Sequence, residues 1–167
     1  MKRLGAMAAL VATTFTAAGA APAPSRGIEE DYYTWRAVKV DSSGGSAFFV
    51  ANEGRAGNAV QFRMLAVYRD LQRPSDVGRR GVELDKELFE FLGDCGSRML
   101  LTTGYRYQKG TEFTPPPIIA APTAEVPLEG STRSLALAAA CGPAGAPGEW
   151  IKAPYAWAKE RLRQARP

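Results

Sequence analysis

The sequence of 167 residues contains no histidine, and this absence excludes whole classes of chemistry. Histidine is the side chain that titrates near neutral pH, so Ser-His-Asp sites, Cys-His sites and histidine-ligated zinc are ruled out. Only two cysteines are present, too few for a four-thiolate zinc site or an iron–sulfur cluster. We therefore expect neither a metal nor a cofactor, in a chain whose length fits one domain.

The N-terminus has the pattern of an export signal. Lys2 and Arg3 precede an alanine-rich apolar stretch over residues 4–17, and residues 18–20 (Ala-Gly-Ala) fit the cleavage rule of signal peptidase. The apolar stretch is shorter than the ~20 residues that cross a bilayer, which favours a cleaved signal peptide over residues 1–20 against a retained anchor. Loss of the two charges of Lys2 and Arg3 lowers the formal net charge from +4 to +2. We thus expect a periplasmic or cell-surface protein with no transmembrane span after cleavage and no nucleic-acid partner.

Export gives the two cysteines a structural interpretation. In an oxidising compartment Cys95 and Cys141 can pair, and two cysteines allow a single connectivity. The alternative is a reactive or redox pair, but redox dithiols usually lie two residues apart and these are 46 apart. We expect a disulfide that stabilises the fold by ~4 kcal/mol through chain entropy.

The middle of the chain predicts β-structure. Residues 21–31 form a proline-containing flexible leader, and a single domain over residues 32–141 follows. Residues 32–40 and 47–51 are apolar runs separated by a Ser/Gly turn, which predicts a β-hairpin. Residues 52–58 are polar and are expected to form the next turn.

Further strands follow this hairpin. Residues 60–68 alternate strictly, with a second face of mixed polarity, as in a strand that is half covered. Residues 97–108 and 111–114 predict two more strands around a Lys-Gly turn. Residues 82–92 fit a helical stripe and a strand equally well, so their structure stays open.

Two helices are expected after the proline-rich connector at residues 115–127. Ser131 is placed as the N-cap of a short helix that Gly142-Pro143 stops, so Cys141 lies at its end. Residues 142–148 form a linker, and residues 149–167 a basic amphipathic helical tail. Such a helix either binds an anionic surface or partner, or docks its apolar stripe on the domain.

Clustered cations are the binding candidates. The polar connection after residue 68 and the tail are the two most basic parts of the mature chain, and each is either a solvated surface or a contact for phosphate, sulfated glycan or an acidic protein. The candidates are Arg69, Arg73, Arg79 and Arg80 in the connection, and Lys159, Arg161, Arg163 and Arg166 in the tail.

The order of these parts resembles the surface-adhesin protein E-like family of bacterial envelope proteins, over about residues 32–141. The matching features are Trp35, Phe48, Phe49, the alternating strand at 60–68, Asp94-Cys95 followed by Arg98, the segment 105–110, and Gly130-Ser131 opening a helix that closes on Cys141. The resemblance implies an α+β fold with a small antiparallel sheet of about six strands and a C-terminal helix tied to it by the Cys95–Cys141 disulfide. It also implies a strand over residues 88–95, and a non-enzymatic binding or structural role toward a host, matrix or envelope protein.

A small periplasmic enzyme is the alternative. Two carboxylates can share acid and base roles without histidine, and Glu90 with Asp94, or the leader group Glu29, Glu30 and Asp31, are the available sets. Neither a phosphate-binding glycine loop nor a nucleophile elbow accompanies them. We therefore favour binding over catalysis.

Overall fold

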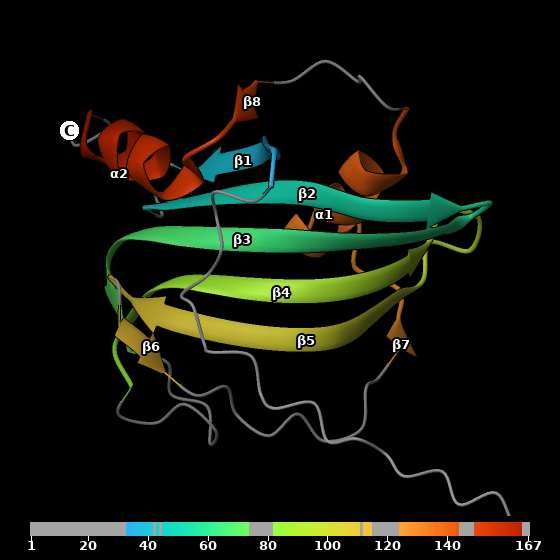
Figure 1. Ribbon diagram of the computed structural model, residues 1–167, viewed down its shortest axis with the longest axis horizontal. Coiled ribbons are helices and arrows are strands. Elements are labelled where there is room, and N and C mark those ends of the chain that lie inside the picture. Colours follow the sequence, from blue (N-terminus) through green and yellow to red (C-terminus); the bar gives the residue numbers. More distant parts are fainter. Residues whose placement is uncertain are drawn as a thin grey trace, which may run out of the picture.

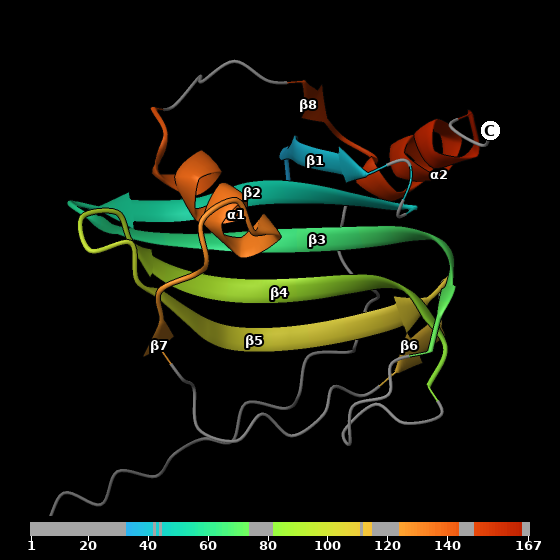
Figure 2. The same ribbon diagram turned by 180° about the vertical axis from the view of Figure 1, so that it is seen from behind.

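One antiparallel sheet with a helix on each face forms the described part of the protein (Figure 1, Figure 2). The computed structural model describes residues 33–164 except for 42, 44, 74–81, 111, 115–123 and 144–148. The predicted signal peptide at residues 1–20 and leader at residues 21–31 lie outside the described residues.

Five long strands and three short ones make up the described sheet. They are β1 (Trp35–Asp41), β2 (Ser46–Ala56), β3 (Ala59–Gln72), β4 (Leu84–Asp94), β5 (Leu100–Lys109), β6 (Glu112–Thr114), β7 (Ala124–Glu125) and β8 (Trp150–Ile151). Their order is β6-β5-β4-β3-β2-β1-β8, with β7 beside β5, and every pairing is antiparallel. This confirms the α+β prediction, although the sheet has more members than the six expected.

The alternation of β3 sets the two faces of the sheet. Phe62 and Met64 are buried in one apolar cluster, whereas Leu65 and Val67 are buried in another on the opposite face. The predicted hairpin of β1 with β2 is confirmed, and the open question at residues 82–92 resolves as the strand β4.

The turn predicted at residues 52–58 is wrong in its extent. β2 continues through exposed residues to Ala56, which pairs with Ala59, so the turn is only Gly57-Asn58. Gly57 has φ +59°, a left-handed conformation that two-residue hairpins require. The polar composition of residues 52–56 reflects exposure of the strand end to solvent rather than a turn.

Helix α1 (Thr132–Cys141) covers the face that contains Phe62 and is seen in front of the sheet in Figure 2. Ser131 is its N-cap as predicted, since its side chain accepts a bond from the Ser134 amide at 3.2 Å. The helix packs closely because Gly93 of β4 has no side chain: a Cβ there would lie 2.5 Å from Leu137 Cδ1.

Helix α2 (Pro154–Gln164) covers the opposite face, at one end of β2 and β3 (Figure 1). Its buried residues Ala158 and Leu162 belong to the same cluster as Trp35 and Leu65, and β8 pairs with the start of β1 just before it. The tail predicted at residues 149–167 is therefore docked, and its described part, residues 149–164, completes the core of the sheet. It is helical only from Pro154, because Trp150 and Ile151 pair with β1 as the strand β8.

Candidate functional site

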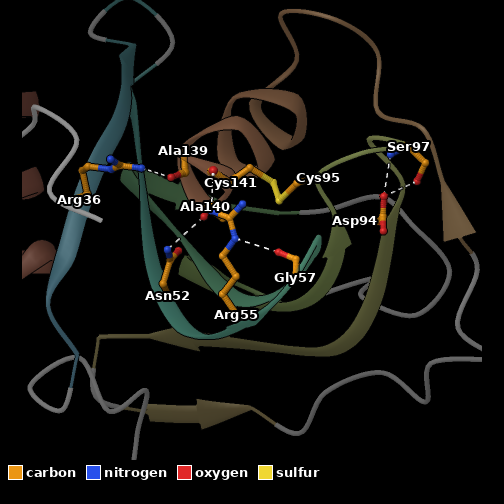
Figure 3. Close-up of a disulfide and its surroundings, with 10 residues drawn as sticks. All are labelled: Arg36, Asn52, Arg55, Gly57, Asp94, Cys95, Ser97, Ala139, Ala140 and Cys141. Atoms are coloured by element: carbon orange, nitrogen blue, oxygen red, sulfur yellow. Dashed lines mark hydrogen bonds between the residues drawn. A yellow bond between two sulfur atoms is a disulfide. The ribbon is translucent and has the colours of Figure 1, made fainter. Parts of the chain in front are cut away.

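The predicted disulfide is present. Cys95, in the turn between β4 and β5, is bonded to Cys141 at the end of α1, with an S–S distance of 2.05 Å and a Cα–Cα distance of 5.6 Å (Figure 3). No free cysteine occurs among the residues that the structure describes. The bond joins the C-terminal end of α1 to the sheet, as the sequence predicted.

Three side chains of β1 and β2 hold the same end of α1. Arg36 donates to the Ala139 carbonyl, Asn52 Nδ2 to the Ala140 carbonyl at 3.2 Å, and Arg55 to the Cys141 carbonyl at 3.1 Å (Figure 3). The last carbonyls of a helix have no intrahelical donor, and cations are favoured there by the helix dipole. Sequence reasoning missed this contact set, because the donors lie 86–103 positions from their acceptors.

The arginines predicted in the connection after residue 68 are engaged within the protein where they are described, and Arg69 lies in β3, because that strand continues to Gln72. Arg69 bonds to Asp70 at 3.1 Å, and Arg73 shares the Glu83 carboxylate with Lys109. Hydrogen bonds from Lys109 and then Arg73, together with their charges, hold the pKa of Glu83 below its usual value. Arg79 and Arg80 lie outside the described residues, so the predicted cluster is represented here by two ion-paired members.

Lys159 of α2 is likewise engaged within the fold. Lys159 Nζ donates to the Tyr68 and Arg69 carbonyls at 2.7 and 3.0 Å and lies 3.3 Å from Asp85. Burial raises the pKa of Asp85, but bonds from the Tyr155 hydroxyl, the Gly110 amide and Lys159 outweigh it and leave the pKa lowered. Lys159 therefore fastens α2 to the sheet.

The described arginines of the tail lie nearer to solvent than Lys159. Arg161 lies over the Trp157 ring, 5.1 Å from its centroid, and is 4.0 Å from Glu149. Arg163 pairs with Glu160 at 2.9 Å and donates to a carbonyl of its own helix. Arg166 lies outside the described residues. Of the tail candidates that are described, Arg161 and Arg163 are the exposed ones.

The carboxylates considered for catalysis are not brought together. Glu90 and Asp94 lie four positions apart on one strand, about 13 Å at the usual rise per residue, beyond the ~5–9.5 Å of paired catalytic carboxylates. Asp94 instead accepts two bonds from Ser97, and these hold its pKa below its usual value. Glu29, Glu30 and Asp31 lie outside the described residues.

The half of the α2-side face that α2 leaves uncovered carries a row of alternating charges. Arg63 Nε lies 2.6 Å from Glu53, and its other end lies 3.4 Å from Glu90. Arg106 of β5 continues the row, 3.8 Å from Glu90, with about half of its side chain exposed. Tyr33 donates to Glu53 at 3.2 Å and lies under the Arg63 guanidinium. We call Glu53, Arg63, Glu90 and Arg106 the charged row.

Beside the charged row, at the β4–β5 turn, lies an apolar hollow of about 390 Å³. Its walls are Ala59, Leu92, Gly93, Asp94, Ser97, Met99, Leu100, Leu101 and Ala124. Leu92 and Met99 are 44% and 43% exposed, unlike the aliphatic residues of the core. A hollow with apolar walls next to a polar rim is the usual composition of a binding surface.

No family model, curated protein or solved structure matches this chain. Within the described residues, no helix is long and apolar enough to cross a membrane. The same residues contain no group of three or more metal-ligating side chains. The site is thus defined by its geometry: a charged row and an apolar hollow on the half of the sheet face that α2 does not cover.

Proposed function

We propose that the chain is an exported, non-enzymatic protein of the bacterial cell envelope that binds a partner through the uncovered half of the sheet, a role like that of the surface-adhesin protein E-like family. The carrying observation is the Cys95–Cys141 bond, which uses both cysteines of the chain. Disulfides persist in oxidising compartments outside the cytosol. The bond and the export pattern of residues 1–20 thus support the same location by independent arguments.

Binding through the charged row is supported by its composition. Arginine is enriched at protein interfaces, and a partly exposed arginine over a carboxylate can exchange that partner for one on another protein. Arg106 is the row's most exposed member, and its distance of 3.8 Å from Glu90 is longer than a direct hydrogen bond. An extracellular or envelope protein with an acidic and apolar surface has the chemistry that this half-face would recognise.

The location is tested by fractionating cells that produce the full chain and alkylating thiols before mass analysis. We expect the chain to be outside the cytosol, shortened at its N-terminus, with neither Cys95 nor Cys141 alkylated until a reductant is added. Cytosolic material with two free thiols would contradict the proposal.

The binding surface is tested with two charge reversals of matched kind. Arg106→Glu alters the charged row, whereas Arg163→Glu alters the exposed side of α2. Binding of the purified chain to immobilised matrix and envelope proteins is expected to fall with Arg106→Glu and to persist with Arg163→Glu. The reverse pattern would assign binding to the basic helix instead, and equal binding by both variants would exclude the half-face.

A further inference from the structure

The apolar hollow has the size of a small-molecule site. Its volume of about 390 Å³ lies within the ~300–1,000 Å³ typical of ligand pockets, and its wall carries few polar atoms. Leu92 and Met99 in its wall are partly exposed, so filling the hollow would remove apolar surface from water. Apolar cavities in proteins bind apolar molecules, which makes a hydrocarbon group the natural occupant.

A cation without a partner lies in the same turn. Arg98 stands between Ser97 and Met99, both of which line the hollow, and it is exposed. Every other arginine in the described part of the chain has a hydrogen bond, ion pair or both. Among the non-glycine residues that the structure describes, Arg98 alone has a left-handed backbone, at φ +59°. A guanidinium without a partner is free to bind an anion.

Asp94 is the opposing charge at this site. Its carboxylate lines the hollow, and its two bonds from Ser97, at 2.6 and 2.9 Å, hold its pKa below the usual value. It would repel an anionic group placed beside it. Asn at this position would keep the oxygen that accepts from Ser97 and remove the charge, so this substitution separates charge from structure.

We propose that the hollow binds a single-chain amphiphile with an anionic head, the hydrocarbon tail lying among Leu92, Met99 and Leu101 and the head pairing with Arg98. The head is a carboxylate, as in a fatty acid, or a phosphate, as in a lysophospholipid. The inference goes beyond the partner-protein role and does not depend on it, since its variants lie outside the charged row and its test is made in solution without a partner protein.

The test uses the purified full chain and cis-parinaric acid, a fluorescent fatty acid whose emission rises in apolar surroundings. Dodecanoate, dodecyl phosphate and dodecanol are then added as competitors. Both anions are expected to displace the probe at concentrations about tenfold lower than dodecanol, because a bond to a charged group is worth about that factor. Stronger competition by dodecanoate assigns a fatty acid, and stronger competition by dodecyl phosphate assigns a phospholipid head.

Matched variants keep the outcome decisive. Ala59 lines the hollow. Ala56 pairs with Ala59 across the two-residue turn but does not line the hollow, and both alanines are exposed. Ala59→Phe is expected to abolish probe binding, and Ala56→Phe to leave it unchanged. Arg98→Gly is expected to weaken dodecanoate about tenfold and to leave dodecanol unchanged, with Arg98→Lys restoring most of the loss.

Any of four results would overturn the proposal. Probe binding that persists in Ala59→Phe, or is absent from the wild-type chain, would show that the hollow is not the site. Equal competition by dodecanol and dodecanoate would remove the role of Arg98. Asp94→Asn checks the sign of the electrostatics, because it must tighten dodecanoate binding and leave dodecanol alone; weaker dodecanoate binding would count against the model.

Discussion

Replacing both cysteines, Cys95→Ser with Cys141→Ser, removes the covalent bond between the β4–β5 turn and the end of α1. The bond closes a loop between positions 46 apart. In the chain-entropy treatment a loop of this length restricts the unfolded state by about 4 kcal/mol. For a domain of this size that difference corresponds to a fall in melting temperature of about 15 °C.

The folded structure should survive this change. Leu137 remains buried against the sheet, and Arg36, Asn52 and Arg55 still donate to the last carbonyls of α1. We therefore expect the far-UV circular dichroism of the folded double variant to match the wild type, while its free energy of unfolding falls by about 4 kcal/mol, the value expected from the lost loop constraint.

Urea unfolding followed by circular dichroism measures the difference. The wild-type chain in a reductant is the control, and it should unfold at the same urea concentration as the double variant. A free energy of unfolding within about 1 kcal/mol of the oxidised wild type would refute the entropic reasoning, since the estimate is four times that. If only the double variant or only the reduced wild type lost stability, the loss could not be assigned to the disulfide bond itself.

Three further changes probe the packing and the buried charge. Gly93→Ala should cost about 1–2 kcal/mol, because the new Cβ displaces the Leu137 side chain; in a thermal-melt double-mutant cycle, adding Leu137→Ala should remove most of that cost. Asn52→Asp should melt at a lower temperature than Asn52→Ala, because it loses the donor to the Ala140 carbonyl and places a negative charge at a helix C-terminus, at a cost of about 1–2 kcal/mol. Asp85 has a lowered pKa, so its contribution to stability is complete above the ordinary carboxyl value near 3.9 and is lost as pH falls through the folded value. Urea midpoints measured from pH 6 to pH 3 should therefore fall less steeply in Asp85→Asn than in the wild type, and parallel curves would contradict this.

Sequence patterns predicted those parts of the fold that depend on interactions between residues close in sequence. The alternation of β3, the hairpin of β1 with β2 and the Ser131 cap depend on neighbouring residues, and each is confirmed. The segment at residues 82–92 was ambiguous because its periodicity fits two structures, and pairing with β3 and β5 decides for a strand. Strand pairing is a long-range property that a pattern along the chain does not contain.

The candidate site depended on long-range packing to a greater extent. The sequence identified basic residues, but not that Lys159 would reach two carbonyls at the end of β3, or that Arg73 would share Glu83 with Lys109. The charged row unites residues of β2, β3, β4 and β5, each isolated in sequence. A free arginine in a turn, Arg98, differs from an engaged one only through its neighbours in space.

Both covers of the sheet come from the end of the chain. Strands β1 to β5 occupy residues 35–109, whereas α1 begins at Thr132 and α2 at Pro154. During synthesis the strands therefore emerge before the two helices that cover their apolar faces, because both helices lie in the last 36 residues. A chain interrupted before residue 131 would lack both helices. Both the Phe62 face and the Leu65 face of its sheet would then be exposed, and exposed apolar sheet faces favour aggregation. Because Cys141 comes late in the sequence, the disulfide can form only after strands β1 to β5 have been synthesised. The bond therefore stabilises the folded sheet and does not guide the early steps of its folding.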